Sequence, residues 1–196
     1  SEPVLRADKA WENGITYAPT VLYDEEEQIY KMWYKTFHFG AYFGSAKSGI
    51  GAKYYTCFAT SEDGFHWTKP RLPLIPFGRH QETNIVYRGV VACQGNHVFR
   101  DPNETNPARK YKMVYVDRGV RLAYSPEGIH WTPAGDDPII ATHSDCNNHV
   151  TYDATRGRWL LYMRPVVNSS GKSIPGVHMK RRVAIAESED LLHWTK

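Results

Sequence analysis

The chain has 196 residues, of which 41% are hydrophobic and 23% charged, a composition typical of a globular protein large enough to bury a core. Its formal net charge of +3 is too small to indicate nucleic acid binding, and no apolar run approaches the roughly 20 residues of a membrane span. Cys57, Cys93 and Cys146 lack the spacing of a zinc site, so we expect buried thiols, no metal and no cofactor.

One motif occurs three times along the chain. It reads "SEDGFHW" up to Trp67, "SPEGIHW" up to Trp131 and "SEDLLHW" up to Trp194. The tryptophans are 131 − 67 = 64 and 194 − 131 = 63 residues apart. A period of this length indicates a repeated structural unit. Within the motif, Asp or Glu followed by Gly predicts a tight turn, and the Trp is expected to pack back on the strands.

A hairpin is predicted upstream of each motif. Aligned on Val21, Val98 and Val150, the segments 19–37, 96–117 and 148–165 each place an Asp three residues later, then a polar turn and an aromatic-rich strand. The aspartates are Asp24, Asp101 and Asp153, and their side chains are expected to bond the backbone amides of the turn. A further strand enters each motif at 53–61, 119–126 and 181–189, and the apolar segments 72–77 and 137–141 lead from the first two motifs into the next repeat.

These elements give about four short strands in each repeat, with the repeats at approximately 11–70, 80–133 and 140–196. The fold class is therefore predicted to be all-β: a β-propeller in which residues 1–196 form about three four-stranded blades of one partial ring. A β-sandwich with accidental similarity between its parts is the alternative. Because propellers typically have 4–8 blades, three predict either a fragment of a larger ring or an assembly.

At these residues the chain resembles the five-bladed propeller glycoside hydrolases related to invertases, levansucrases and arabinanases. The resemblance is carried by the repeated "S-x-D-G-x-x-W" turns, by "FRDP" at 99–102 and by hairpins of the type "DEEEQIYKMWY". The chain is still more similar to uncharacterised bacterial propellers of that group, through "ETN-I-V", "RDPN", "YKM" and "HSD". The resemblance implies a five-bladed ring, a carbohydrate substrate and three catalytic acids on different blades.

Two polar clusters stand at the starts of repeats, where we look for these acids. In "THSDCNNHV" Asp145 is flanked by His143 and Asn147, and in "GRHQETNIV" Glu82 is flanked by His80 and Asn84. Glycoside hydrolysis generally needs two carboxyl groups, so Asp145 and Glu82 are the predicted pair, with the acid and base roles left open. The alternative is that both are solvated loop residues that bond only their neighbours.

Other candidates depart from the family pattern or are less specific. Asp101 in "FRDP" matches the invertase motif whose Asp stabilises the transition state, but the repeat places it at the hairpin turn, which we favour. The first repeat has Ala18 where arabinanase-like enzymes carry a catalytic carboxylate. Further substrate-binding candidates are Asn96, His97 and Arg164; the Gly-rich segment 37–54 is a candidate cover for the substrate.

Three functions remain open from the sequence. The favoured hypothesis is a glycoside hydrolase that acts on poly- or oligosaccharides, placed outside the cytoplasm by resemblance alone. The second is a non-catalytic propeller that binds glycans or proteins, supported by Ala18. The third is a sialidase-like enzyme, which needs an arginine cluster from Arg79, Arg100 and Arg164. A carbohydrate is the expected partner, without nucleic acid or membrane, and the oligomeric state is left open.

Overall fold

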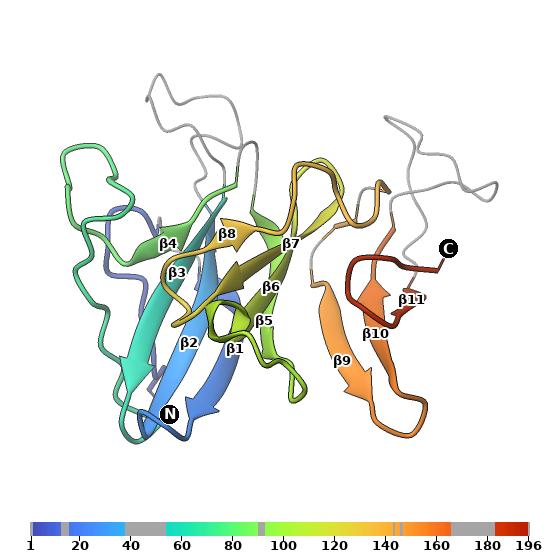
Figure 1. Ribbon diagram of the computed structural model, residues 1–196. Coiled ribbons are helices and arrows are strands. Elements are labelled where there is room, and N and C mark those ends of the chain that lie inside the picture. Colours follow the sequence, from blue (N-terminus) through green and yellow to red (C-terminus); the bar gives the residue numbers. More distant parts are fainter. Residues whose placement is uncertain are drawn as a thin grey trace. The chain divides into compact units, whose positions relative to one another are not determined.

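The computed structural model describes residues 2–12, 16–37, 54–89, 93–142, 144–145, 147–165 and 183–195. Over this part of the chain the secondary structure consists of β-strands and one short 3-10 helix, η1 (Pro107–Arg109), with no helix long and apolar enough to cross a membrane. The strands form three antiparallel sheets (Figure 1). The chain divides into two compact units, Ser1–Cys93 and Gln94–Lys196.

The first unit contains a four-stranded sheet in the order β1-β2-β3-β4. Its strands are β1 (Thr16–Asp24), β2 (Ile29–Phe37), β3 (Tyr54–Ser61) and β4 (Ile85–Tyr87). The segment Lys31–Phe37 of β2 is buried on both faces, which explains why its apolar residues do not alternate with polar ones. The hydrophobic core of this unit combines residues of β2, β3 and β4 with two residues from outside the strands: Trp11, Met32, Tyr34, Tyr55, Cys57, Ala59, Phe77 and Ile85.

The second unit contains two sheets, with the strand orders β5-β6-β7-β8 and β11-β10-β9. Their strands are β5 (Gln94–Arg100), β6 (Tyr111–Val116), β7 (Val120–Ser125), β8 (Thr132–Pro133), β9 (His149–Asp153), β10 (Arg158–Met163) and β11 (Ala184–Ser188). A shared core joins the two sheets: Phe99, Val114, Val116, Val120, Leu122, Val150, Trp159, Leu161, Met163 and Leu191.

The first strands of these two sheets, β5 and β9, lie next to each other. The backbone N–H of Val150 on β9 donates to Nδ1 of His97 on β5 at 3.2 Å, and the rings of His97 and His149 have centroids 4.1 Å apart. The side chains at the beginning of β9 are therefore held against the beginning of β5, and this contact positions the candidate site.

The three predicted hairpin turns are confirmed. Oδ1 of Asp24 accepts from the N–H of Glu26 at 3.1 Å, Oδ1 of Asp101 from Asn103 at 2.9 Å, and Oδ1 of Asp153 from Thr155 at 3.0 Å. In the first two hairpins a buried lysine of the next strand also forms an ion pair with the aspartate. Each aspartate thus supplies acceptors for turn amides that the ladder leaves unpaired.

The three tryptophan turns are confirmed as well, and they share one hydrogen-bond pattern. The motif Ser hydroxyl accepts from the backbone N–H three residues on, at 2.9, 2.7 and 2.9 Å, and the Trp Nε1–H donates to the carbonyl of that same residue at 3.0, 3.1 and 2.9 Å. This residue has a positive φ in every copy: Gly64, Gly128 and Leu191, at 77°, 89° and 68°. The leucine adopts a conformation that favours glycine, and its side chain is buried in the core.

The fourth strands of the first two sheets, β4 and β8, contain three and two residues. The outer edge of β7 is paired by β8 and then by Ile140, whereas that of β3 is paired by Thr68 and then by β4. Prolines interrupt both segments, at 70, 73 and 76 and at 133 and 138, and a proline has no N–H to donate to a ladder. In the third sheet, the bridge between Ser188 and Trp194 is the one pairing seen at the outer edge of β11 among the described residues.

Candidate functional site

Asp145 lies in the loop 144–148, which leads into β9, and it is held by residues from two other strands. Its backbone N–H donates to the carbonyl of Arg164, which follows β10, at 2.9 Å. The hydroxyl of Ser144 accepts from the N–H of Arg164 at 3.0 Å, so the two backbone segments are joined side by side. The position of Asp145 is therefore fixed by the hairpin of the third sheet and does not depend on its side chain alone.

The carboxylate of Asp145 has a donor on each oxygen. Oδ1 accepts from Nε2 of Gln94, at the start of β5, at 2.6 Å, and Oδ2 forms an ion pair with Arg164. Two donors suit an ionised carboxylate, because a protonated oxygen would have to donate a hydrogen bond of its own. The side chains of Asp145 and Arg164 are 31% and 25% exposed, so a ligand can still reach them.

The loop is locked onto β5 by an asparagine and a glycine. Asn148 is buried, and its N–H and its Nδ2 both donate to the carbonyl of Gly95, at 3.2 and 3.1 Å. A Cβ on Gly95 would lie 2.5 Å from Nδ2 of Asn148 and 2.9 Å from the carbonyl oxygen of Asp145, and the φ of Gly95 is +60°. Only glycine allows this close approach, so Gly95 and Asn148 act as the clamp that holds Asp145.

Next to the clamp, His97 is held as a neutral imidazole. Burial first and the nearby His149 second lower the pKa of His97 to about 3. Because Nδ1 accepts the Val150 N–H, the proton of the neutral ring is on Nε2, which remains a donor. His149 and Asn147 are exposed beside it, and Asn147 has a φ of 58°, which asparagine tolerates better than most residues. Among the other candidates of this cluster, Asn96 is buried on β5, and His143 lies outside the described residues.

Asp101 does not share this site. It follows the far end of β5, whereas Gln94, the partner of Asp145, begins the strand, and a strand of this length spans roughly 20 Å. The same separation divides Arg100 from Arg164, so these two arginines do not form the cluster that a sialidase-like site needs. Asp101 acts in the hairpin turn, where the internal repeat places it.

In the first unit, Asn84 belongs to a buried network instead of an exposed site. Its Oδ1 accepts from Nε1 of Trp11 at 2.8 Å, and its Nδ2 donates to the hydroxyl of Tyr34 at 2.6 Å and to the Phe58 carbonyl at 2.8 Å. The hydroxyl of Tyr34 donates to the fully buried Glu12. Asn84 and Trp11 are thus structural residues, and Trp33, packed on Phe58 with no exposed surface, is a core residue.

Glu82 and His80 lie on the loop that leads to the outer strand β4. Glu82 is exposed and forms an ion pair with Arg71 at 2.6 Å, and the ring of His80 packs edge-on against Trp11 with centroids 5.7 Å apart. Glu82 therefore stands beside the edge of its sheet formed by β4, at the opposite side from β1.

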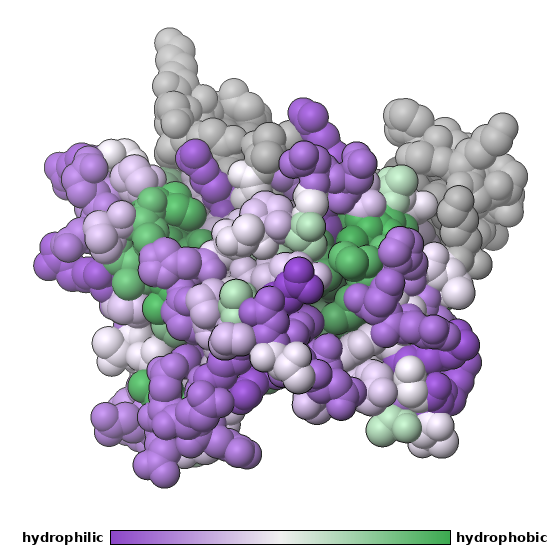
Figure 2. Space-filling view, viewed as in Figure 1, coloured by the Kyte–Doolittle hydropathy of each residue, from purple (hydrophilic) through white to green (hydrophobic). Residues whose placement is uncertain are grey.

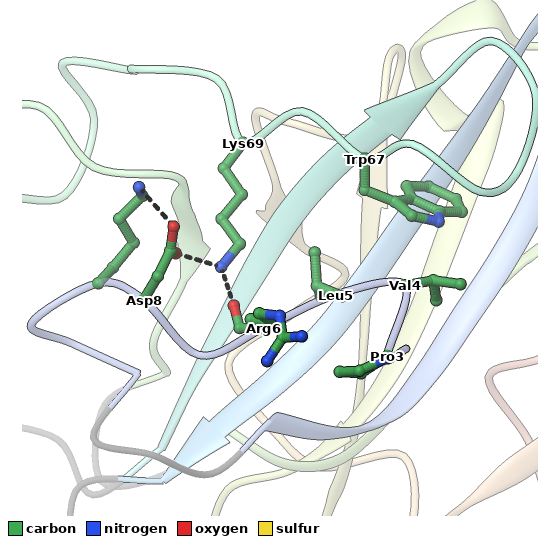
Figure 3. A pocket seen from close by; sticks show the side chains of 8 residues that line it. Pro3, Val4, Leu5, Arg6, Asp8, Trp67 and Lys69 are labelled. Atoms are coloured by element: carbon green, nitrogen blue, oxygen red, sulfur yellow. Dashed lines mark hydrogen bonds and ion pairs between the residues drawn. The ribbon is translucent and has the colours of Figure 1, made fainter. Parts of the chain in front are cut away.

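A pocket of about 370 Å³ in the first unit is a weaker candidate. It lies between the N-terminal segment and the first tryptophan turn (Figure 3). Lys9 and Lys69 are among the residues that line it, and the ammonium group of Lys69 is bound by several partners. Lys69 binds Asp8 at 2.7 Å and Glu12 at 2.7 Å and donates to the Arg6 carbonyl. These ion pairs attach the segment to the sheet, which favours a structural role for this pocket.

Sequence reasoning missed Gln94 and Gly95. Both belong to "QGNHVF", a polar stretch before a buried strand, which is the same signal that identified Asp145. The repeat alignment matches this stretch with "CNNHV" of the third repeat. The sequence therefore already indicates that the two stretches hold equivalent positions before the first strands of their sheets. Their contact with Asp145 depends on the packing of β5 against β9, which no local pattern specifies.

Comparison by sequence finds no match to a known protein family and none to a curated protein. Comparison of structures finds matches across nearly the whole chain. A fructofuranosidase variant from Schwanniomyces occidentalis, solved with fructosylnystose, aligns with a TM-score of 0.64 at 15% identity, over 97% of this chain and 34% of that one. A structure from the GH130 family of mannoside phosphorylases, which contains hydrolases of β-1,2 mannosidic linkages, aligns with a TM-score of 0.60 at 14% identity, over 99% and 55%.

An N-acetylgalactosamine deacetylase from F. plautii, solved with blood group B trisaccharide, aligns with a TM-score of 0.54 at 14% identity, over 91% of this chain and 51% of that one. The chain thus spans between about a third and somewhat over half of the length of these structures. At this level of identity the likeness concerns the fold, which is that of the β-propeller glycoside hydrolases and confirms the predicted fold class.

Proposed function

We propose that the protein is a carbohydrate-active enzyme that hydrolyses a glycosidic bond, with Asp145 as one of its carboxyl groups. The observation that carries the proposal is the setting of Asp145: a partly exposed carboxylate in the loop before β9, fixed by a clamp and by donors from Gln94 of β5 and from Arg164, which follows β10. Functional side chains held this firmly by packing and hydrogen bonds are typical of catalytic sites. The fold, which the chain shares with glycoside hydrolases, supports the same reaction class.

The donors on Asp145 favour a role for its ionised form. A carboxylate can act as the nucleophile or general base of hydrolysis, or stabilise the positive charge that develops on the sugar in the transition state. Gln94 and Arg164 orient its oxygens, and the exposed part of Arg164 can bind a sugar hydroxyl or an acidic substituent of the substrate. Glu82 is the second carboxyl group predicted from sequence, and the assay below tests whether it takes part in the reaction.

The test is hydrolysis of aryl furanosides, aryl mannosides and acidic oligosaccharides by the wild-type protein and by Asp145→Asn. The substitution keeps the size and an acceptor for Gln94 but removes the charge. We expect kcat to fall by about 10²–10⁴-fold, the usual contribution of a positioned catalytic carboxyl group. Unchanged kcat in a folded Asp145→Asn variant contradicts the proposal.

Glu82→Gln in the same assay tests the second half of the pair. A comparable loss of kcat assigns Glu82 to the chemistry. Activity equal to wild type leaves Glu82 with its exposed ion pair to Arg71, a pair expected to contribute little to stability, and moves the search for the acid to other residues.

A non-catalytic glycan-binding propeller is the second candidate, and Ala18 favours it, since the first repeat lacks the family's carboxylate. The same fold also carries different chemistry, as the deacetylase shows, so fold alone does not specify a reaction. Binding on a glycan array that survives Asp145→Asn, without hydrolysis of any bound glycan, supports this candidate. An extracellular or periplasmic location is proposed with either function, and cell fractionation tests it.

A further inference from the structure

A β-bulge at the start of β5 turns two polar side chains of the candidate site to the same face of the sheet. Gln94 is paired with Val116 of β6 and His97 with Val114, so three steps along β5 correspond to two steps along β6. Directly paired residues share a face, and so do residues two apart on one strand. Gln94 and His97 therefore lie on one face of β5, although residues three apart on a regular strand point to opposite faces.

This bulge is a repeated feature of the fold. In the first sheet the pairing of β1 with β2 shifts register between Tyr17 and Thr20. In the repeat alignment these two residues are the equivalents of Gln94 and His97. A bulge at the same place in two repeats belongs to the architecture, and bulges often re-aim side chains beside functional sites.

The carboxylate of Asp145 is bound over this same face of β5. Nε2 of Gln94 donates to Oδ1 of Asp145 at 2.6 Å. Two positions along a strand are about 7 Å apart, so His97 stands about one monosaccharide unit away from the residue that orients this carboxylate. A sugar unit bound at Asp145 therefore also reaches His97.

Three contacts fix the imidazole ring of His97. Its Nδ1 accepts from the backbone N–H of Val150 at 3.2 Å, its plane makes an angle of 13° with that of Phe99, and the His149 ring lies 4.1 Å away between centroids. Because the Val150 N–H points at Nδ1, the proton of the neutral ring is on Nε2, and this atom can only donate. The ring is half-buried, and its lowered pKa leaves it uncharged at neutral pH. Among the residues that the structure describes, no acceptor is bound to Nε2.

A role in folding alone needs only one side of this ring. The Val150 N–H requires an acceptor, and the side-chain oxygen of an asparagine at position 97 could supply one as well as Nδ1 does. The histidine adds a second group, a rigid and uncharged donor on the face that carries Gln94. Rigid donors of this kind are what a site uses to recognise an oxygen of its ligand.

We propose that His97 is a specificity-determining residue of the candidate site, and that its Nε2–H donates a hydrogen bond to an uncharged hydroxyl oxygen of the substrate. The inference rests on the proposed function, because it places a sugar unit beside Asp145. A neutral donor recognises an oxygen without favouring a negative charge, so the sugar unit at this position is a neutral one. Figure 2 shows hydrophilic side chains, in purple, over most of the described surface in view, which suits a ligand rich in hydroxyl groups.

The test measures binding of the aryl furanosides and aryl mannosides of the hydrolysis assay, by titration calorimetry or as KM where the ligand is hydrolysed. The glycoside that binds most tightly is compared with its analogues that each lack one hydroxyl group. His97→Asn keeps an oxygen for the Val150 N–H but is too short to place an N–H at the position of Nε2. His97→Gln is one methylene longer and can supply both groups.

We expect His97→Asn to weaken binding about tenfold or more, and His97→Gln to restore most of the affinity. One analogue should bind wild type about tenfold more weakly than the parent glycoside does. The same analogue should bind His97→Asn as well as the parent does, because this variant has already lost the hydrogen bond. His130→Asn, which removes an exposed histidine of the second tryptophan turn, is the matched control and should not change binding.

A measurement on the wild-type protein needs no substitution and keeps the proposal testable if a variant does not fold. In protein with isotope-labelled histidine, NMR should show the proton of His97 on Nε2, and this N–H signal should shift when the glycoside is added. A proton on Nδ1, or a signal that stays unchanged while the glycoside binds, overturns the proposal.

The remaining outcomes separate this inference from the proposed function. If His97→Asn leaves binding unchanged, or weakens the parent and every analogue by the same factor, His97 is structural and only this inference is overturned. Binding that follows the expected pattern without any hydrolysis overturns only the proposed function. A panel in which no glycoside binds overturns both.

Discussion

His97 shows how one buried contact determines the chemistry of a residue in the site. Its folded-state pKa of about 3 lies below the value near 6.5 expected in an unfolded chain. Below pH 6.5 the unfolded state therefore binds the proton first, and the free energy of unfolding decreases as the pH falls from about 6.5 toward 3. At neutral pH the ring carries no charge and cannot repel a cation or attract an anion in the site.

This predicts that the protein loses about 1.6 kcal/mol of stability between pH 6.5 and pH 5 through His97, within the limit of about 1.4 kcal/mol per pH unit for one proton. Urea unfolding of wild type and His97→Gln at both pH values measures it, since Gln can still accept the Val150 N–H but does not titrate. The pH dependence should be smaller in the variant. An NMR titration in which His97 protonates near pH 6.5 would show that the ring is not held neutral.

At the scale of the element, the loop 144–148 depends on close contact with β5, and Gly95 tests it. In Gly95→Ala the new Cβ would meet Nδ2 of Asn148 at 2.5 Å and the Asp145 carbonyl at 2.9 Å, so the loop must shift. Gly78 is the matched control, because its φ of +55° resembles the +60° of Gly95 while nothing lies within 4 Å of its Cβ position. Gly78→Ala measures the backbone strain alone.

We expect Gly78→Ala to lower the free energy of unfolding by about 1 kcal/mol and Gly95→Ala by about 3 kcal/mol. Urea denaturation gives both values. Gly95→Ala should also reduce the proposed glycosidase activity, since it displaces Asp145, whereas Gly78→Ala should not. Equal losses of stability in the two variants would mean that the loop is not clamped to β5.

The elements that sequence predicts best are those whose hydrogen bonds are local. The tryptophan turns and the hairpin aspartates bond residues two or three positions away, so the spacing of the motif already contains the geometry. Asn84 had the same polar setting before a strand as Asp145, yet its partners Trp11 and Tyr34 are 73 and 50 residues away and buried. Polarity alone does not distinguish a buried network from an exposed site, because that difference arises only when distant elements pack.

At the scale of the whole molecule, the first unit is held to its N-terminal segment by a buried charge. Glu12 has no exposed surface; it accepts from the N–H groups of Asp8 and Lys9, binds Lys69 at 2.7 Å and accepts the hydroxyl of Tyr34. Beside this network, burial, Cys57 and Glu12 raise the pKa of Tyr34 far above its ordinary value, so the phenol remains a donor. All residues of this hydrogen-bond and ion-pair network belong to the first unit.

Glu12→Gln removes this charge and leaves Lys69 with Asp8 as its one remaining carboxylate partner among the described residues. Breaking a buried ion pair costs about 3 kcal/mol, because the remaining charge is poorly compensated. We expect amide hydrogen exchange to become faster in β2 and β3 of the first unit, while β6 and β10 of the second unit keep most of their protection, since the two units have separate cores. Glu82→Gln, which breaks only an exposed ion pair of the same unit, should leave exchange unchanged throughout. If Glu12→Gln instead lowers protection equally in both units, the two cores unfold together and the chain behaves as one cooperative domain.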